Sequence, residues 1–354
     1  MKIGIITFHK AHNYGAVIQC FALQETLRNM GHNVRIIDYR QPTIERAYKV
    51  FDFKKWAKYV LSLKKDALTY LYSIPVRMTK KRNFERFVSL YCNLTQIANP
   101  DDMPQDFDCY IVGSDQVWNW KILDDKLDSV YIGEFKRPKS SRLIGYAISG
   151  NLASLDMLGV DYLKKVITKF DLISFREGTL SKVVNCLTGI QVHVCCDPTL
   201  LTDPFFWDSV TNTKFQNRKY VLLYEVRYPK ADRLLLCKKA QKLASIMGCE
   251  LIIVNSGKYS VEDFVSLFKY ASHIVTSSFH ATAFSLIFQR PFYAVKLKDG
   301  FDGRYENLLH AIKADNLCVD TNFDPVPVKP DFRPITQALS NYRQQSLNFL
   351  KLMK

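Results

Sequence analysis

The stretch from Ile3 to Met30 reads IGIITFHKAHNYGAVIQCFALQETLRNM, and its two halves differ in hydrophobic period. Ile3–Phe8 is a short apolar run rich in β-branched residues, which is typical of a strand buried on both faces. After the polar loop around Asn13–Gly15, a helical pattern extends to about Met30, and Gly31 is well placed to end that helix. The stretch therefore predicts a buried parallel strand followed by a helix, the first unit of a doubly wound α/β sheet.

The alternation of short apolar runs and helical stretches continues through the rest of the chain. In the first half, the strand-like runs are Val34–Asp38, Cys109–Val112, Leu143–Ala147, Leu172–Phe175 and Val192–Cys196. In the second half, they are Tyr220–Tyr224, Glu250–Val254, Ile274–Thr276 and Phe292–Val295. Strands that alternate with helices in this way imply a parallel sheet covered by helices on both faces.

A break near Asp197–Phe206, where Pro198 and Pro204 flank a short apolar run, divides the chain into two parts. We therefore expect an α/β protein with two doubly wound, Rossmann-like domains that face a cleft. The N-terminal domain is expected at 1–200 with a basic helical insertion at about 45–90, the C-terminal domain at 205–330, and a C-terminal helix at 331–354. Ligands bind such sheets at the carboxyl ends of the strands, so we expect the chemistry in the loops that follow strands.

Length and composition are those of a globular protein, with 354 residues of which 47% are hydrophobic. No run approaches the roughly 20 uncharged apolar residues that span a bilayer. The N-terminal residues lack the basic-then-apolar pattern of a signal peptide, so we expect a cytoplasmic protein. The nine cysteines are scattered, with only Cys195 and Cys196 adjacent, and no histidine lies at ligand spacing; we therefore expect no metal site.

The formal net charge of +15 is unevenly distributed. Between residues 54 and 82 there is one acid, Asp66, against nine basic residues: Lys54, Lys55, Lys58, Lys64, Lys65, Arg77, Lys80, Lys81 and Arg82. Trp56, Tyr59, Leu63 and other apolar residues lie between them, a composition typical of a basic amphipathic helix at an anionic membrane surface. A solvated helical face with a core stripe explains the segment equally well. We expect no nucleic-acid partner, because the polar loops of the cleft are not cationic.

Two loops after strands carry side chains suited to hold sugar hydroxyls. The first contains Asn13, Tyr14 and Gly15, with Gln19 one turn into the helix; its small residues let a ligand approach a helix N-terminus. A capped helix start would explain Asn13 and Gly15 but not Gln19. The second loop offers a hydroxyl, a carboxylate, amides and an indole, from Ser114, Asp115, Gln116, Trp118 and Asn119. We expect both loops to bind an acceptor, with the indole covering a sugar ring, although Asp115 could simply cap the next helix.

Two further loops carry groups suited to an anionic ligand. Arg176 follows a buried strand and can point its planar fork at a carboxylate or phosphate, while an internal pair with Glu177 or an aspartate is an equally open interpretation. Ser277, Ser278 and His280 open an apolar helix directly after another strand. Free backbone N–H groups and hydroxyls there favour a phosphate, and a histidine can transfer a proton near neutral pH. A lone histidine is more often structural, but its place on such a loop favours a functional role.

Taken together, these segments resemble the polysaccharide pyruvyl transferase family over nearly the whole chain. The motifs that carry the resemblance are Ile3–His9 with Asn13–Val17 and Gln19, Gly113–Asn119, Ser174–Glu177, Asp197–Leu201, and Ser278–His280 followed by Phe292. The family is similar in fold to the GT-B glycosyltransferases, which agrees with two facing domains. The resemblance implies transfer of a pyruvyl ketal from phosphoenolpyruvate to two hydroxyls of one sugar, with release of phosphate and without a cofactor. The acceptor expected is a galactose-type sugar in a capsule, exopolysaccharide or cell-wall precursor.

The resemblance also assigns roles to residues. His280 matches the family histidine proposed as general acid, Arg176 matches an arginine that holds the donor, and Phe279 falls in the donor site. Many members carry an arginine two residues before the histidine, where this chain has Ser278. We expect Arg304 to replace the missing charge, with Lys296 and Lys298 as alternatives.

Two other functions remain open at this point. One is a GT-B-type glycosyltransferase that uses a sugar nucleotide, and the other is a non-catalytic, membrane-associated module that binds polysaccharide. Only a pyruvyl transferase is expected to release phosphate from phosphoenolpyruvate in the presence of a galactoside. This reaction therefore distinguishes that hypothesis from the two alternatives. A lipid-linked acceptor would place the enzyme peripherally on the inner face of the membrane, where the basic segment meets anionic lipid.

Overall fold

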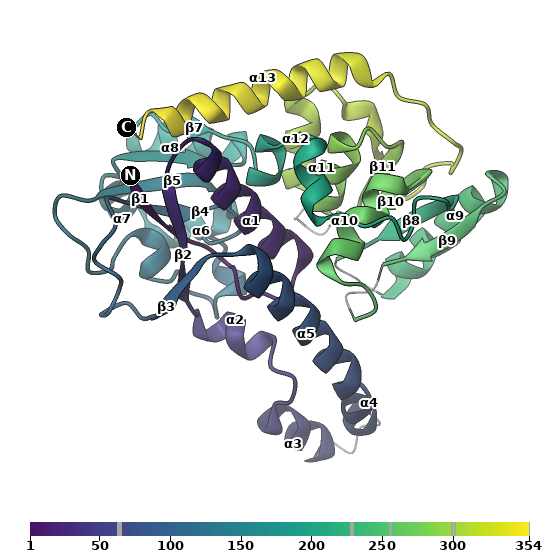
Figure 1. Cartoon of the computed structure of the whole chain (residues 1–354), viewed down its shortest axis with the longest axis horizontal. Coiled ribbons are helices and arrows are strands. Elements are labelled where there is room, and N and C mark those ends of the chain that lie inside the picture. The colour runs from purple at the N-terminus through teal and green to yellow at the C-terminus, as the bar shows by residue number, and fades with distance from the viewer. Residues whose placement is uncertain (62–65, 227–229, 255–256, 299, 301, 354) are drawn as a thin grey trace.

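The computed structural model describes residues 1–61, 66–226, 230–254, 257–298, 300 and 302–353. Its strands form two separate parallel sheets that lie side by side, with helices packed around each (Figure 1). The expected fold class, two doubly wound α/β sheets with a C-terminal helix, is confirmed. We call the parts built on the first and the second sheet the first lobe and the second lobe.

Within the described residues, the first sheet has seven parallel strands in the order β3-β2-β1-β4-β5-β6-β7. They are β1 Lys2–Ile6, β2 Asn33–Tyr39, β3 Leu94–Ala98, β4 Cys109–Gly113, β5 Arg142–Ile148, β6 Leu172–Phe175 and β7 His193–Val194. In the central strand β1, Ile3 pairs with Val34 on one side and with Cys109 on the other. β1 is buried from Ile3 to Ile6, because neighbouring strands flank it and helices cover both of its faces.

Helices of the first lobe cover the two faces of this sheet. α1 (Tyr14–Asn29) and α5 (Ile74–Tyr91) pack on one face, where Leu23 and Phe87 join the main core. α7 (Val160–Ile167) and α8 (Gly178–Thr188) supply Leu163 and Val184 to a separate core on the other face. The remaining elements of this lobe are α2 Pro42–Ala47, α3 Phe53–Leu61, α4 Asp66–Tyr72, α6 Leu152–Leu158 and the 3-10 turns Trp120–Ile122 and Val130–Ile132.

The second sheet has five parallel strands among the described residues, in the order β12-β11-β10-β8-β9. They are β8 Tyr220–Tyr224, β9 Glu250–Ile253, β10 His273–Thr276, β11 Phe292–Lys296 and β12 Cys318–Asp320. α9 (Lys230–Ile246) packs on one face, where Leu236 and Leu243 lie in the core. The other face carries α10 (Val261–Tyr270), α11 (Phe279–Ile287), α12 (Gly303–Ala311) and the 3-10 turn Asp315–Leu317.

The two lobes share one continuous core. The ring of Tyr14 on α1 stacks on Phe264 of α10 with 4.1 Å between ring centroids, and its hydroxyl donates to the backbone oxygen of Tyr259. Two 3-10 helices, Pro198–Leu201 and Phe205–Val210, connect the sheets.

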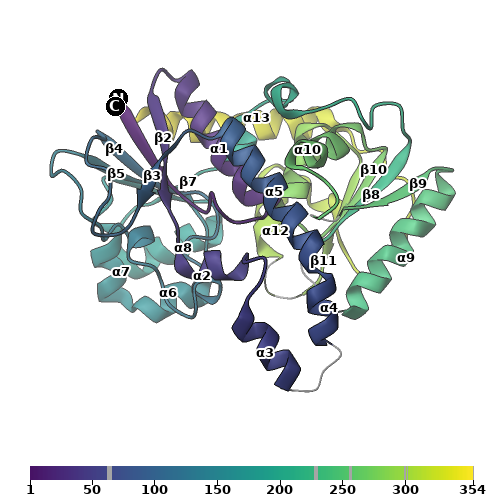
Figure 2. The same ribbon diagram turned by 60° about the horizontal axis from the view of Figure 1, so that its bottom comes forward.

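The C-terminal helix α13 (Phe332–Lys351) runs from the second lobe back across the first (Figure 1). On its way, Arg343 donates to the backbone oxygen of Leu200, and the hydroxyl of Ser346 accepts from the backbone N–H of Cys196. Farther along, the ring of Phe349 packs on Tyr146 of β5. The helix therefore ties the two sheets together, and the two termini lie close to each other (Figure 2).

Both sheets present a topological switch point to the space between the lobes. The strand order of the first sheet reverses between β1 and β4, and that of the second sheet reverses between β8 and β10. Loops that leave two neighbouring strands in opposite directions open a crevice at the carboxyl ends of those strands. The loops after β1, β4, β8 and β10 should therefore form one site.

Two features of the strands differ from the sequence-based expectations. The edge strands β3 and β12 were not predicted, and the expected strand Val192–Cys196 is shortened to β7. The basic insertion forms α3, α4 and the start of α5, a helical projection from the first lobe (Figures 1 and 2). Of its expected residues, Leu63, Lys64 and Lys65 lie outside the described residues. None of the described helices is both long and apolar enough to cross a membrane.

Candidate functional site

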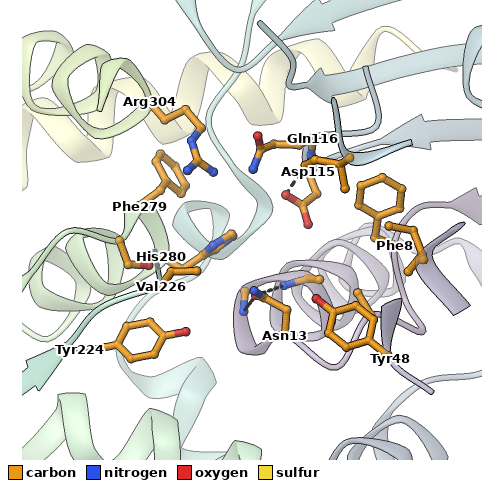
Figure 3. A pocket seen from close by; sticks show the side chains of 16 residues that line it. Phe8, Asn13, Tyr48, Asp115, Gln116, Tyr224, Val226, Phe279, His280 and Arg304 are labelled. Atoms are coloured by element: carbon orange, nitrogen blue, oxygen red, sulfur yellow. Dashed lines mark hydrogen bonds between the residues drawn. The ribbon is translucent and has the colours of Figure 1, made fainter. Parts of the chain in front are cut away.

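A cavity of about 250 Å³ lies where the two switch points face each other. Figure 3 shows Arg304, Phe279 and His280 of the second lobe on one side and Phe8, Asp115 and Gln116 of the first lobe on the other. The remaining lining residues are Ala11, Asn13, Gly15, Ala16, Ile44, Tyr48, Ile122, Tyr224, Val226 and Ser278. Each expected switch-point loop contributes to the wall, so the site is assembled from both lobes.

His280 stands at the start of α11, between a buried carboxylate and the N-terminus of α1. Its Nε2 lies 3.6 Å from Oδ2 of Asp197, a distance of ion pairing rather than of a hydrogen bond. The opposite edge of the ring, with Nδ1, lies against Gly15, where an added Cβ would overlap the imidazole. The carboxylate thus orients one ring nitrogen, and the other lies on the side of Gly15, which lines the cavity.

Gly15→Ala is expected to displace the His280 ring, because the new methyl group would occupy its space. If His280 transfers a proton, turnover should fall at least about tenfold, since small misplacements of a catalytic group are costly. Gly178→Ala is the matched control, because the nearest atom to its added Cβ is 3.9 Å away. Steady-state kinetics of both variants check this, and equal turnover in the two would contradict the packing role of Gly15.

Asp197 is the centre of a buried polar network beneath the cavity. It is fully buried and accepts hydrogen bonds from Nη1 of Arg176 at 2.8 Å and from the hydroxyl of Thr199 at 2.8 Å. Burial alone would raise the pKa of Asp197, but His280 and Arg176 hold it well below its usual range. Asp197 is therefore a carboxylate, able to stabilise positive charge on His280.

Arg176 is a member of this network and does not line the cavity. Its guanidinium also donates to the hydroxyl of Ser149 at 2.7 Å and to Glu177 at 3.2 Å, and it lies over the ring of Phe279. Burial alone would lower the pKa of Arg176, but Glu177 and Asp197 raise it above its usual value. Of the two interpretations of Arg176 that the sequence left open, the structure shows the internal ion pair, with Glu177 and Asp197 as partners. In this structure Arg176 contacts Asp197 and Phe279 beneath the cavity, and its contact with the donor stays a prediction.

The remaining donor-side residues gather at the N-terminus of α11. Ser278 and Phe279 line the cavity together with Arg304 of α12, while Lys296 and Lys298 pair with Glu306 and Asp320 elsewhere. The Ser278 hydroxyl makes no capping hydrogen bond, and the first N–H groups of a helix lack intrahelical partners. Ser277 lies just beneath, with its hydroxyl buried and without a partner among the described residues. Of the three candidate cations, Arg304 is thus the one placed beside Ser278.

The acceptor-side loops supply polar groups across the cavity from Arg304. Asp115 and Gln116 line it, and Asp115 has a φ of 70°, a left-handed conformation that is uncommon for a residue with a side chain and often marks a functional loop. Asn13 also lines the cavity and at the same time caps α1, because its Oδ1 accepts from the backbone N–H of Gly15 at 2.9 Å. Ligand binding and capping are therefore combined at Asn13.

Five expected acceptor residues lie outside this cavity. Trp118 is a core residue that packs on Phe175 and donates its indole N–H to the backbone oxygen of Tyr131, so it does not cover a sugar ring as expected. Gln19 and Ser114 are buried and hold the loops after β1 and β4 in place. Asn119 and Tyr14 line two neighbouring cavities, of about 270 and 390 Å³. Gln116 and Arg304 border the first of these as well, and Asn13 borders the second.

Sequence reasoning missed three residues of the site. Asp197 was identified only as the first residue of the Asp197–Leu201 motif and was given no role. Its position directly after a strand-like run was the signal that could have indicated a buried carboxylate at the site. Tyr224 ends β8, where the rule for carboxyl ends of strands would have found it. Tyr48 lies in the insertion, which was expected to stay outside the cleft; burial and the nearby Asp115 raise the pKa of Tyr48 to about 12. Its hydroxyl therefore stays protonated and can donate to a ligand.

Among the described residues, no group of three or more His, Cys, Asp or Glu side chains is placed to hold a metal ion. The groups that line the cavity are a histidine backed by a carboxylate, an arginine, hydroxyls, amides and one carboxylate. Such a set can supply proton transfer, anion binding and recognition of hydroxyl groups.

Two doubly wound lobes with these groups at facing switch points define an α/β protein whose ligand site lies between the two lobes. The family model of polysaccharide pyruvyl transferases matches residues 13–299, and the chain belongs to this family. No curated protein matches the chain.

Several solved structures share its overall path at low sequence identity. A UDP-GlcNAc 2-epimerase from Methanocaldococcus jannaschii, in complex with UDP-GlcNAc and UDP, is 12% identical with a TM-score of 0.42, covering 97% of this chain and 93% of its own. A UDP-GlcNAc 2-epimerase from Neisseria meningitidis bound to UDP-GlcNAc is 10% identical with a TM-score of 0.44, covering 98% and 94%. A heptosyltransferase from E. coli is 11% identical with a TM-score of 0.36, covering 98% and 99%.

Proposed function

We propose that this enzyme transfers the enolpyruvyl group of phosphoenolpyruvate to two hydroxyls of one galactose-type sugar, forming a ketal and releasing phosphate. The observation that carries the proposal is the position of His280, held between Asp197 and Gly15 beside Arg304 at the start of α11. The reaction needs a proton donor next to a site for two anionic groups, and this arrangement offers both. Family membership supports the same reaction class.

The chemistry divides into two additions at the same carbon. His280 donates a proton to the methylene carbon of phosphoenolpyruvate, which becomes a methyl group, and a sugar hydroxyl adds to the adjacent carbon while its proton passes back to His280. Phosphate then leaves with the electron pair of its C–O bond, and the second hydroxyl adds to the oxocarbenium carbon and passes its proton to the departing phosphate. The negative charge of Asp197 stabilises His280 while it is protonated. Atoms and charges balance without a redox step or cofactor.

The anionic groups of the donor fit the second-lobe side of the cavity. The guanidinium of Arg304 suits a carboxylate or phosphate, and the free N–H groups at the start of α11 favour negative charge. The acceptor then occupies the side of Asp115, Gln116 and Asn13, whose oxygen and nitrogen atoms can hold sugar hydroxyls. Ser278, at the position where many family members carry an arginine, lines the same cavity as Arg304.

A direct assay tests the proposal. The purified protein is incubated with phosphoenolpyruvate and a soluble galactoside, and we expect phosphate release together with an acceptor whose mass increases by one ketal-linked pyruvyl group. The same protein is incubated with sugar nucleotides and the galactoside. Glycosyl transfer in the second reaction, with no phosphate release in the first, would assign the site to a glycosyltransferase. Absence of both reactions, with binding of the sugar alone, would assign it to a binding module.

Arg304→Lys should raise the KM for phosphoenolpyruvate about tenfold, because a point charge cannot reproduce the bidentate fork of a guanidinium. The KM for the acceptor should change much less. Arg333→Lys, at an exposed position on α13, is the matched control and should leave both constants unchanged. An unaltered KM for phosphoenolpyruvate in Arg304→Lys would remove Arg304 from the donor site.

The acceptor and its location are further parts of the proposal. We propose a precursor of a capsule, exopolysaccharide or cell-wall polymer, carried on a lipid at the cytoplasmic leaflet, with the enzyme bound peripherally. The basic insertion supports this placement, because Lys and Arg near an anionic leaflet are attracted to it.

A further inference from the structure

The helical insertion projects away from both lobes. We call its described residues 51–61 and 66–78, which comprise α3, α4 and the first turn of α5, the arm (Figures 1 and 2). No residue of α3 is buried. The helices of the arm are held together by a small aromatic cluster of their own, in which Tyr70 contacts Tyr59 and Phe51, with ring centroids 5.9 and 6.0 Å apart. The arm is thus a helical projection whose outer surface is not covered by the other residues that the structure describes.

Large apolar side chains are concentrated on this outer surface. Leu61 is 85% exposed and Tyr72 is 81% exposed. The other large apolar residues exposed on the arm are Phe51, Phe53, Val60, Leu68, Leu71, Val76 and Met78. Of the 26 exposed large hydrophobic residues of the described chain, nine therefore lie in this short segment. Such a concentration of exposed apolar side chains usually marks a site of interaction.

Positive charge accompanies the apolar surface. Lys54, Lys55 and Lys58 are exposed on α3 between the apolar positions, and Lys81 and Arg82 continue the charge along α5. A second copy of the chain would bring the same charge to the contact, in a protein whose formal net charge is already +15. Nucleic acid would match the charge but not the exposed leucines and phenylalanine. An anionic lipid bilayer matches both, because its headgroups attract lysine and its acyl region receives apolar side chains.

We infer that the arm docks on an anionic bilayer and inserts the apolar side chains Phe53, Leu61 and Leu68 into it. Each lysine near such a surface strengthens binding about fivefold, and each large apolar side chain removed from water adds at least about tenfold. Salt weakens the attraction of the lysines to the anionic surface but not the burial of the apolar side chains. Binding is therefore more resistant to salt than attraction between charges alone would be.

Docking in this way orients the candidate site toward the membrane. Tyr48, just before the arm, lines the main cavity, and Lys80, just after it, lines the neighbouring cavity of about 390 Å³. Lys80 lies only six residues, about 9 Å, along α5 from Ile74. A sugar carried on a lipid headgroup can thus reach the cavity while its lipid stays in the bilayer. In this respect alone the inference rests on the proposed function.

Vesicle binding of the full chain tests the inference. We expect the protein to bind vesicles that contain phosphatidylglycerol much more tightly than vesicles of phosphatidylcholine alone, and to stay partly bound at high salt. Phosphatidylglycerol with brominated acyl chains should quench the fluorescence of Trp56, which lies on α3. The quenching should be lost in Trp56→Phe, because Trp118 and Trp207 are buried in the core and Trp120 lies in a 3-10 turn outside the arm.

The triple variant Phe53→Ser, Leu61→Ser, Leu68→Ser should bind at least about tenfold more weakly and lose its salt-resistant fraction. The control, Leu187→Ser, Leu234→Ser, Ile246→Ser, removes three exposed apolar residues from other surfaces and should bind like the wild type. Unfolding midpoints of both variants establish that they are folded. Equal binding of the two variants, or vesicle binding without quenching of Trp56, would overturn insertion by the arm.

Two further measurements separate the inference from other possibilities. Sedimentation of the wild type and the triple serine variant in the absence of lipid detects self-association; a dimer lost only in that variant would assign the arm to a second copy and overturn the inference. Pyruvyl transfer to a soluble galactoside should be the same in the triple variant and the wild type. If the wild type shows no such transfer but binds vesicles through the arm, the proposed function fails and the docking role of the arm stands.

Discussion

Replacing His280 with alanine is expected to lower the rate of pyruvyl transfer about 10²–10⁴-fold, which is the usual contribution of a positioned general acid. The imidazole is held between Asp197 and Gly15, so water that enters the vacated space lacks its fixed geometry. The KM for phosphoenolpyruvate should change much less, because Arg304 and the start of α11 are retained. Phosphate release under saturating substrates measures the effect.

His310→Ala is the control for this substitution. His310 is an exposed histidine on α12 that pairs with Asp315, so its removal should leave turnover unchanged. Unfolding midpoints of both variants exclude a loss of folded protein as the cause. Turnover of His280→Ala within twofold of the wild type would remove His280 from the mechanism, and proton transfer would then have to be sought elsewhere in the cavity.

Asp197→Ala is expected to have the largest effect on stability. The substitution removes a buried partner of Arg176, which keeps Glu177 as its remaining carboxylate. Breaking a buried ion pair by deleting one partner typically costs about 3–5 kcal/mol, and the retained Glu177 places this case near the lower end. Transfer activity should fall as well, since His280 loses the charge that orients it.

The pH dependence of unfolding distinguishes this electrostatic effect from a packing defect. The pKa of Asp197 is depressed in the folded protein, so its contribution to stability is present above the ordinary aspartate pKa of about 4 and is lost as the pH falls further. The difference in unfolding free energy between the wild type and Asp197→Ala should therefore narrow in acid. Urea unfolding at neutral and acidic pH measures it. Asp324→Asn, in an exposed pair with Lys242, serves as the control and should show no measurable change at either pH.

The sequence was most informative about the strands that lie inside the sheets. β6 and β8 begin and end at the expected residues, because a strand buried on both faces must be apolar along its whole length. β3 and β12 were missed because edge strands face fewer neighbours and keep a mixed pattern, as in Leu94–Ala98. The sequence predicted a basic helical insertion but not that it projects from the first lobe. A basic amphipathic pattern is the same for a helix that packs on the sheet and for one that projects from it.

For the site, the sequence located the right loops more reliably than it located side chains within them. The loops that contain Asn13, Asp115 and His280 all reach the cavity, because the carboxyl ends of parallel strands share one edge of a sheet. Within a loop, some residues line the cavity and others belong to the core: Asp115 and Gln116 line the cavity, whereas Trp118 packs beneath it. The direction in which a loop side chain points depends on the backbone conformation, such as the left-handed φ of Asp115. The spacing of residues in the sequence does not encode that conformation.

The return of α13 to the first lobe has a consequence for how the protein is made. Phe349 packs on Tyr146, and Ser346 accepts a hydrogen bond from the backbone N–H of Cys196, so residues from the far end of the chain complete the core beneath β5 and the segment that follows β7. During synthesis, the first lobe emerges from the ribosome long before these partners exist. The apolar surface of the first lobe that α13 covers therefore stays exposed until the second lobe and α13 have been made. The first lobe thus cannot complete its folding before the second lobe and α13 are made. A nascent chain stalled before residue 332 should therefore bind chaperones.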